Sequence, residues 1–215
     1  IALENDYGNS KLAAENVLSN LSISNGNPIV IFRLPGVFGK WCKPNYNSVV
    51  ATFCHNIAHG LPIKVNDSNK ILDLVYIDDV ISSFVAQIDN VAPGVKLENK
   101  IPQYHLSVGD LANKIKAFEM SRSSLIMEQV GVGLMRALYS TYVSYLPTNK
   151  FSYTVESYGD ERGVFVEMLK TIDSGQFSFF TAHPGVTRGG HYHHSKTEKF
   201  MVIKGQAKFC FRHII

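Results

Sequence analysis

Several features that define large protein classes are missing from this sequence of 215 residues. Its three cysteines, Cys42, Cys54 and Cys210, lie far apart and form no Cys-x-x-Cys pair, so they indicate reduced thiols rather than a disulfide framework. No apolar run is long enough to cross a bilayer, and no signal-peptide pattern opens the chain. The formal net charge of +3 comes without a basic cluster, which argues against nucleic-acid binding. We therefore expect a cytoplasmic protein without membrane or nucleic-acid partners.

The composition is that of an ordinary globular protein, with 45% hydrophobic and 18% charged residues. A chain of 215 residues can form one large domain or two small ones, each with a core of its own. The chain opens on Ile1, just before a helical pattern, and stops at Ile215 within a strand pattern. We therefore expect it to be a piece of a longer protein.

Residues 185–205 carry the clearest chemical pattern. His191 and His193 are two positions apart, so on an extended strand their rings leave the same face, while His194 leaves the other. Glu198 follows one tight turn later, at the entry to the apolar run 200–203, and residues 207–211 alternate as a further strand. Two imidazoles and a carboxylate are a ligand set for a divalent transition metal with open positions. The alternative is a histidine-rich loop whose side chains are merely hydrogen-bonded.

The spacing of this stretch resembles the first motif of the cupins: Gly, five residues, His-x-His, four residues, Glu, six residues, Gly. The resemblance implies a β-barrel in which His191, His193 and Glu198 bind a metal ion, zinc in the family pattern. The second cupin motif, which supplies another histidine ligand, does not occur in this sequence.

Residues 6–18 show helical spacing of apolar residues and are followed by an Asn-Gly stop signal. Tyr7 and Lys11 are one turn apart, so a phenol and an ammonium can meet on one side of the helix. An ammonium stabilises an anionic oxygen beside it, which suits a tyrosine that passes a proton. The alternative is a chance pairing on a solvated helix. The string Tyr-Gly-x-Ser-Lys-x-x-x-Glu resembles the active-site helix of the extended short-chain dehydrogenases, which implies catalytic and cofactor-binding roles for Tyr7 and Lys11.

Residues 28–39 form a continuous apolar run, which predicts a parallel strand buried on both faces. By the same resemblance, Pro35 and Gly36 lie near the nicotinamide. A later stretch, residues 71–80, resembles that family's strand ending in Val-Asp-Asp-Val, and we expect Asp78 or Asp79 to cap the next helix. Leu72 stands where the family often carries an arginine that grips a diphosphate, so the usual clamp is altered.

Residues 39–48 form a polar loop before an apolar helix at 49–58, which Asn47 or Ser48 can cap. The free N–H groups of a helix start, flanked by lysines, suit a pyrophosphate. In the dehydrogenase family this region holds the diphosphate of a nucleotide sugar, and a capped surface helix with solvated lysines is the alternative. The substrate-binding residues expected here are Lys40, Lys43, Asn45, Asn47 and Ser48.

Beyond Pro147 the apolar period changes from helical to two, so we place a domain boundary there. The string Asp-x-Arg-Gly-x-Phe-x-Glu at 160–167 resembles the sugar-nucleotide 3,5-epimerases, themselves cupin-shaped. In those enzymes a histidine in a context like that of His191 is the base that removes a proton beside a ketone. His191 thus has two possible roles, metal ligand or base, and the complete His-x-His and Glu spacing favours the ligand.

A dehydrogenase part followed by a cupin part resembles the bifunctional UDP-2-acetamido-2,6-dideoxy-hexulose reductases of bacterial capsule synthesis, the CapF type. The resemblance implies an α/β plus β fold, with the C-terminal part of an extended short-chain dehydrogenase Rossmann domain in residues 1–147. It implies the first part of a cupin barrel in residues 148–215.

The chemistry that this resemblance implies is NADPH-dependent reduction of a UDP-linked 4-ketosugar after epimerisation at C3, in a homodimer. The glycine-rich dinucleotide loop and the triad Ser or Thr are absent from the sequence, so we expect the chain alone not to bind NADPH. The alternative is a sugar-nucleotide epimerase or dehydratase whose cupin only dimerises or binds metal.

Overall fold

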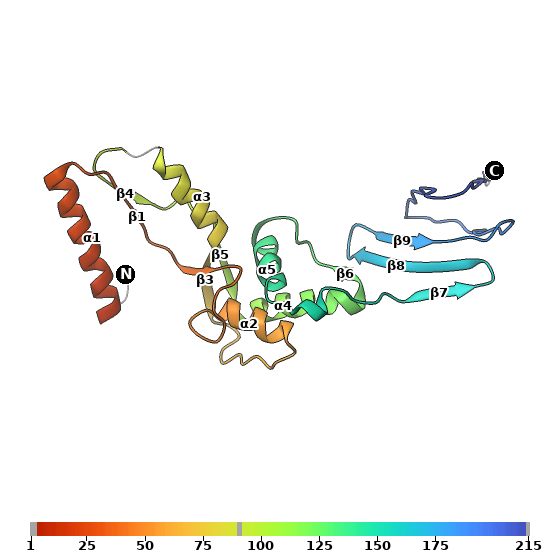
Figure 1. The fold of residues 1–215 in the computed structure, drawn as a ribbon, viewed down its shortest axis with the longest axis horizontal. Coiled ribbons are helices and arrows are strands. Elements are labelled where there is room, and N and C mark those ends of the chain that lie inside the picture. Colours follow the sequence, from red (N-terminus) through yellow and green to blue (C-terminus); the bar gives the residue numbers. More distant parts are fainter. Residues whose placement is uncertain (1–3, 90–91, 214–215) are drawn as a thin grey trace.

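The computed structural model describes residues 4–89 and 92–213 of the chain. The helices are α1 (Asp6–Asn25), α2 (Val49–Ala58), α3 (Ile77–Ile88), α4 (Val108–Ser124), α5 (Gly133–Val143) and the short 3-10 helix η1 (Thr148–Lys150). The strands are β1 (Ile29–Phe32), β2 (Gly36–Phe38), β3 (Ile71–Tyr76), β4 (Val95–Glu98), β5 (Gln103–Ser107), β6 (Ile126–Met127), β7 (Ser157–Asp160), β8 (Gly163–Thr171) and β9 (Gln176–Phe180). Helices α1 to α5 alternate with the short strands β1 to β6 in the first two thirds of the chain, and the antiparallel strands β7, β8 and β9 follow (Figure 1).

The strands form three small sheets. β1 pairs with β4 in parallel, and a second sheet has the order β2-β3-β5, with β2 parallel and β5 antiparallel to β3. In the third sheet β8 pairs antiparallel with β7 and β9, and β6 joins its end in parallel. Because β6 precedes the expected boundary at Pro147, this pairing links the helical part of the chain to the β part.

The main core lies between the β2-β3-β5 sheet and the helices α2, α4 and α5. Phe118 is 1% exposed there, and its ring centroid lies 5.2 Å from that of Tyr139 and 6.0 Å from that of Tyr142. The three cysteines are free, as expected, and burial raises the pKa of the Cys54 thiol in this core.

Truncation of Phe118 tests how far this core carries the fold. We expect Phe118→Ala to lower the free energy of unfolding by about 3–5 kcal/mol, because the lost ring leaves a cavity among aromatic neighbours. Met120 on the same helix is 57% exposed, so Met120→Ala should change the free energy of unfolding by less than about 0.5 kcal/mol. Urea unfolding of both variants measures the difference, and equal effects would contradict this description of the core.

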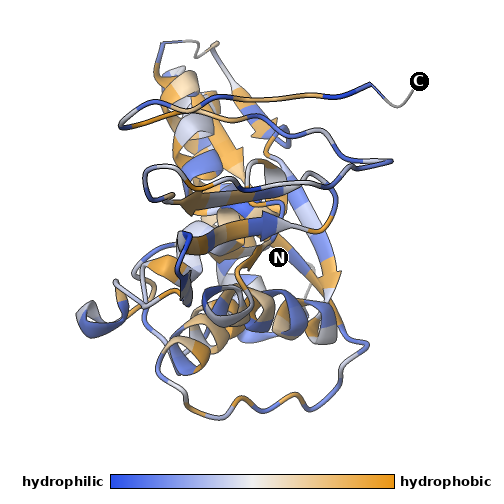
Figure 2. Ribbon diagram, turned by 90° about the vertical axis from the view of Figure 1, so that its right-hand side faces the viewer, coloured by the Kyte–Doolittle hydropathy of each residue, from blue (hydrophilic) through white to orange (hydrophobic). Residues whose placement is uncertain are grey.

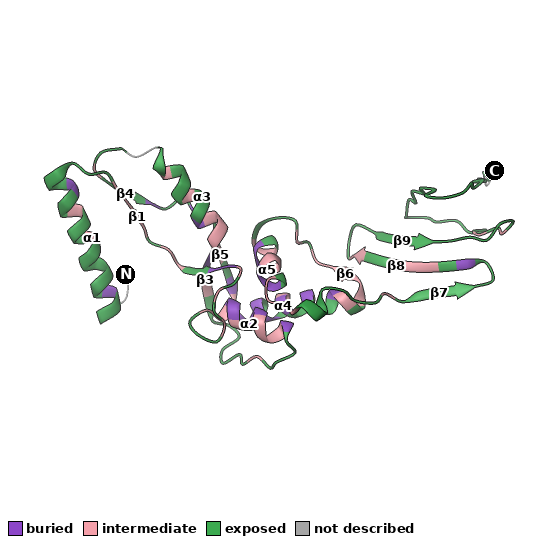
Figure 3. Ribbon diagram, viewed as in Figure 1, coloured by how far each residue is buried: buried purple, intermediate pink, exposed green. Residues whose placement is uncertain are grey.

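The helix expected at residues 6–18 is confirmed and continues to Asn25. The Asn5 side chain caps its start by accepting from the Gly8 N–H, and Gly26 ends it with a left-handed φ of 69°. The apolar residues that predicted this helix remain substantially exposed, as Figure 3 shows for α1. The spacing of the apolar residues therefore predicted the helix correctly, but within this chain these residues do not form a buried face of it.

The single buried strand expected at residues 28–39 is wrong. β1 and β2 belong to different sheets, and the side chains of β1 are only half-buried. Between them Pro35 lacks an N–H for a ladder, and the residue before a proline is itself restricted. The ladder therefore breaks at residues 33–35, and the charged Arg33 turns to α1 instead.

The cap expected from Asp78 or Asp79 is also wrong. α3 begins at Ile77 with Tyr76 at the capping position, and no side chain caps it. Both aspartates lie inside the first turn, where their negative charge still favours the helix start. The start of α4 does have a side-chain cap, since the Ser107 hydroxyl accepts from the Asp110 N–H.

Residues 181–213 contain neither helix nor strand, so the strands expected around 191–193, 200–203 and 207–211 are wrong. Alternation of apolar residues selects a face, but a strand exists only through a partner that completes its ladder. Figure 2 shows hydrophobic stretches along this irregular segment, and Phe200, Met201 and Ile203 are exposed. A closed barrel is therefore not formed by the described residues of the β part. Within the same described residues, no helix is both long and apolar enough to span a membrane.

Candidate active site and metal centre

The first turns of α1 bring Tyr7 and Lys11 together. The Lys11 ammonium lies 5.3 Å from the centroid of the Tyr7 ring, which confirms that the two side chains share one side of the helix. The Tyr7 side chain is 67% exposed, so its phenol is accessible to a ligand. The geometry suits a phenol that exchanges a proton beside a cation.

Glu15 and Arg33 connect this helix to the strand that follows it. The Arg33 guanidinium donates to both carboxylate oxygens of Glu15, at 3.1 and 2.7 Å. The hydrogen bond lowers the pKa of Glu15 and raises the pKa of Arg33. Glu15 is the last position of the Tyr-Gly-x-Ser-Lys-x-x-x-Glu string, yet sequence reasoning gave it no task. The fork-shaped pair fixes α1 against the end of β1, which orients the helix that carries Tyr7.

Pro35 and Gly36 lie where β2 begins. Pro35 lines a small cavity with Arg33, Glu98 and Ile101. A Cβ atom on Gly36 would lie 3.1 Å from the Asp73 carbonyl oxygen, so glycine allows β2 and β3 to approach closely. These two residues thus lie where the chain passes from β1 to β2, and not within one long strand.

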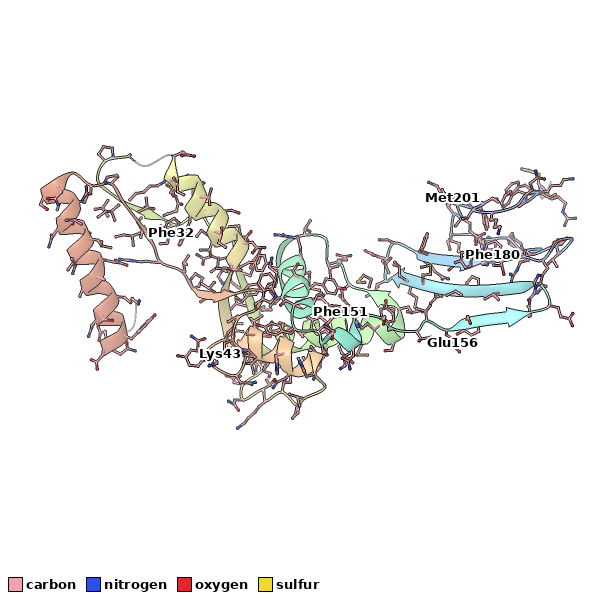
Figure 4. The ribbon with its side chains drawn as sticks, in the orientation of Figure 1. Phe32, Lys43, Phe151, Glu156, Phe180 and Met201 are labelled. Carbon is pink, nitrogen blue, oxygen red and sulfur yellow. The ribbon has the colours of Figure 1, made fainter. Side chains whose placement is uncertain are left out.

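Lys40 does not point freely into solvent. Its ammonium donates to the Asp78 carboxylate at 2.9 Å and lies 5.8 Å from the centroid of the Tyr76 ring. The hydrogen bond with Asp78 raises the pKa of Lys40, and in turn the Lys40 partner lowers the pKa of Asp78. Asp78 therefore positions a lysine rather than capping a helix, a task that its position in sequence did not signal. Lys43 lies over the Tyr46 ring at 5.4 Å, on the loop before α2 (Figure 4).

The rest of the loop is attached to two helices. The backbone N–H of Trp41 donates to the hydroxyl of Ser144, directly after α5, and that of Asn45 donates to the Thr52 hydroxyl of α2 at 3.0 Å. Trp41 and Asn45 both have positive φ, of 61° and 54°, a conformation uncommon outside glycine. Such a loop is held in its shape by its contacts, and strained loops often occur at functional sites.

Ser48, rather than Asn47, caps α2 by accepting from the Ala51 N–H at 3.3 Å. We expect Ser48→Ala to lower the free energy of unfolding by about 1 kcal/mol, since the N–H loses its partner. Asn47→Ala serves as the matched control and should have a clearly smaller effect. Thermal unfolding of the two variants decides between them, and a larger loss for Asn47→Ala would assign the cap to that residue.

The three expected metal ligands are brought together in the irregular segment. The rings of His191 and His193 have centroids 4.7 Å apart, and His193 Nε2 lies 3.3 Å from Glu198 Oε1. One ligand atom from each of the three residues lies within 4.8 Å of the others. A small contraction would place all three around one Zn²⁺, whose bonds to nitrogen and oxygen are about 2.0–2.2 Å long. The residues present therefore fit a divalent ion.

His194 is paired with a different ring from the expected ligands. It packs edge-on against Tyr192 with centroids 5.0 Å apart, while the His191 ring meets that of His193. The Lys196 ammonium lies 3.6 Å from Glu198 Oε1 and competes with a metal ion for that oxygen. The ligand set thus arises from local spacing alone, without the strand expected to carry it.

Residues 160–163 turn the chain from β7 into β8. The Arg162 side chain donates to the Asp160 carboxylate at 2.9 Å, which lowers the pKa of Asp160. Gly163 has a φ of 133°, and a Cβ there would lie 2.4 Å from the Thr181 carbonyl oxygen. Only glycine fits this turn. The turn between β7 and β8 therefore accounts for Arg162 and Gly163 in the epimerase-like string.

Two family comparisons divide the chain. Residues 1–101 match the NAD dependent epimerase/dehydratase family, and residues 158–215 match the polysaccharide biosynthesis C-terminal domain. Solved structures at low identity share the mixed α/β fold, such as the enzyme WbmF of Bordetella bronchiseptica in complex with NAD⁺ and UDP, with 18% identity and a TM-score of 0.55 over 67% of this chain and 54% of that one.

Two relatives match nearly the whole chain. The UDP-2-acetamido-2,6-beta-L-arabino-hexul-4-ose reductase of Pseudomonas aeruginosa is 59% identical over 99% of this chain and 57% of its own length. The capsular polysaccharide assembling protein CapF of Staphylococcus aureus is 40% identical, with a TM-score of 0.81 over 89% of this chain and 52% of that one. The chain spans about half the length of these relatives. Over nearly its whole length this chain is therefore similar to the Pseudomonas reductase and to the Staphylococcus CapF protein.

Proposed function

We propose that the protein containing this chain reduces a UDP-linked 2-acetamido-2,6-dideoxy-4-ketohexose with NADPH and inverts its C3, in the synthesis of N-acetyl-L-fucosamine for capsule or O-antigen. The observation that carries the proposal is the Tyr7 and Lys11 pair on α1, with the ammonium 5.3 Å from the ring centroid. The 59% identity to a reductase of this substrate class supports the choice of sugar.

The candidate site residues of the dehydrogenase part have the following roles in this proposal. NADPH, when bound, supplies the hydride for C4. Tyr7 gives its phenolic proton to the oxygen on C4, while Lys11 holds the nicotinamide ribose and stabilises the phenolate left behind. Pro35 and Gly36 would border the nicotinamide, and the pairing of Glu15 with Arg33 attaches α1 to the same stretch of chain.

The loop before α2 would hold the UDP diphosphate. Its two lysines differ, because Lys40 is engaged by Asp78 whereas Lys43 lies over an exposed tyrosine ring. Lys43 is therefore the better candidate for a direct contact with phosphate, and Lys40 shapes the loop and adds to its positive field. Asn45, Asn47 and Ser48 precede the free N–H groups at the start of α2, where an anion is stabilised.

The β part would act on C3. A carbonyl at C4 makes the neighbouring C3 proton acidic, so inversion needs a base that removes this proton, a group that polarises the C4 oxygen, and a proton donor, a side chain or water, on the opposite face of C3. A zinc ion held by His191, His193 and Glu198 would supply Lewis-acid polarisation of the sugar oxygens. If His191 instead acts as the base, the His193 ring at a centroid distance of 4.7 Å would orient it, and Glu198 would hold His193 in turn at 3.3 Å. We assign residues 1–147 to the dehydrogenase part and 148–215 to the cupin part, acting in a homodimer.

The test is NADPH consumption by the full-length protein on the UDP-linked 4-ketosugar. Consumption of one NADPH per sugar supports the proposed reductase. The second candidate is a sugar-nucleotide epimerase or dehydratase with a non-catalytic β part. It is favoured by 32% identity to a dTDP-L-rhamnose 4-epimerase of Burkholderia thailandensis over 52% of this chain. A sugar product formed without net NADPH consumption would establish this second candidate.

A further inference from the structure

Two histidines on α2 lie outside the site described above. His55 is half-buried, and His59, directly after the last residue of the helix, is exposed. They are one helical turn apart, and their rings stack with centroids 4.2 Å apart and planes 24° from parallel. Stacked imidazoles one turn apart present two nitrogen ligands on one face of a helix.

The hydrogen bonds of His59 define which of its nitrogens carries the proton. His59 Nδ1 lies 2.8 Å from the carbonyl oxygen of His55. A carbonyl oxygen only accepts, so Nδ1 must be the donor and must carry the hydrogen. In the neutral ring, Nε2 is then left with a free lone pair.

The same argument holds for His55 through a neighbouring amide. Its Nδ1 lies 3.2 Å from Asn56 Oδ1, while Asn56 Nδ2 donates to the Pro62 carbonyl oxygen at 3.0 Å. The bond to Pro62 fixes which end of the amide is nitrogen, so the atom facing His55 is an acceptor. The neutral ring of His55 therefore also carries its proton on Nδ1 and leaves Nε2 unprotonated.

We propose that His55 and His59 form a binding site for a divalent transition-metal ion, with both Nε2 atoms as ligands and water in the other positions. Metal-ligating histidines donate their second ring nitrogen to an oxygen that fixes tautomer and orientation, and both rings already do so here. Imidazole nitrogen suits Zn²⁺, Ni²⁺ and Cu²⁺. Because the ring centroids lie 4.2 Å apart, a small tilt of the two rings about their Nδ1 hydrogen bonds would bring both Nε2 lone pairs to one ion.

The surroundings set the strength of this site. The Tyr145 ring meets His55 edge-on with centroids 6.2 Å apart, and burial raises the pKa of Tyr145 to about 12, so it is a neutral neighbour. Lys150 donates to the Ala58 carbonyl oxygen at 2.8 Å and places one positive charge near the ion. The ion would bridge the last turn of α2, at the opposite end from Ser48, and would stabilise that turn when bound.

The test uses Zn²⁺ alone, titrated calorimetrically into the chain carrying His193→Ala and Glu198→Ala, which removes ligands of the other cluster. We expect one ion to bind, and we expect His59→Ala or His55→Ala added to this background to weaken it at least tenfold. Asn56→Ala, which leaves both ligands but releases the His55 ring, should weaken it by about 10–100-fold. His105→Ala is the matched control, since His105 pairs with Asp73 on another face and should not change binding.

Circular dichroism of each variant ensures that the fold is kept, which is expected because His59 lies at an exposed helix end. No binding in the background variant would overturn the proposal, as would binding that survives His59→Ala unchanged. A loss with His55→Ala and His59→Ala but none with Asn56→Ala would support the two ligands and overturn the role of Asn56 in orienting them.

Discussion

Tyr7→Phe in the full-length protein is expected to lower kcat for NADPH-dependent reduction by about 100- to 10,000-fold, the range that one positioned acid contributes. The change removes a single oxygen, the one that would protonate the C4 oxygen of the sugar. KM for the UDP-sugar should change little, because the loop before α2 and not Tyr7 would hold the diphosphate. Steady-state rates of NADPH oxidation measure both quantities.

The expected loss of activity in Tyr7→Phe would not come from unfolding of the variant. Tyr7 is 67% exposed, so its hydroxyl adds little to stability, and thermal unfolding of the variant should match the parent. Tyr158→Phe is the matched control, because it removes the same hydroxyl from an exposed tyrosine of β7, where the hydroxyl donates to Glu156. Lys11→Met should act mainly through the cofactor, raising KM for NADPH. A Tyr7→Phe variant that keeps kcat within twofold of the parent would remove Tyr7 from the chemistry.

The helical part of the fold could be predicted because its signals are local. Asn-Gly at 25–26, the Ser48 cap and the Ser107 cap each act within one turn of the backbone. Tyr7 and Lys11 met as expected because a helix fixes the separation of residues four apart. Asp78 was misassigned because its partner Lys40 is far away in the sequence, and a cap motif does not reveal a distant competitor.

The β part shows the opposite behaviour. Apolar alternation at 200–203 and 207–211 predicted strands, but ladder pairing depends on segments remote in sequence, which alternation does not identify. The strand split at Pro35 has a local cause instead, because proline has no N–H to donate to a ladder. The three expected metal ligands nevertheless came together, because His191, His193 and Glu198 are close enough in sequence for a turn to join them. Spacing within a turn is therefore a stronger predictor of this site than the strands assumed to carry it.

The largest effect expected in the β part is the loss of metal and of C3 inversion in His193→Ala. Removing a direct ligand should weaken metal binding by more than the roughly 10–100-fold that outer contacts cost. Elemental analysis of the full-length variant should therefore show the metal of this site lost. Exchange of the C3 proton with deuterium from solvent, followed by NMR, should slow at least about 100-fold, because a base or a polarised oxygen is lost.

The reductase half separates this effect from general damage. Supplied with a 4-ketosugar whose C3 is already inverted, His193→Ala should consume NADPH at the parent rate, because Tyr7 and Lys11 lie on α1 and are untouched. His194→Ala is the matched control, since its ring packs on Tyr192 and not on the ligands, and it should keep both metal and exchange. If His193→Ala loses the metal but still exchanges the C3 proton at the parent rate, the ion only stabilises the β part. Inversion would then have to come from a base that does not depend on it.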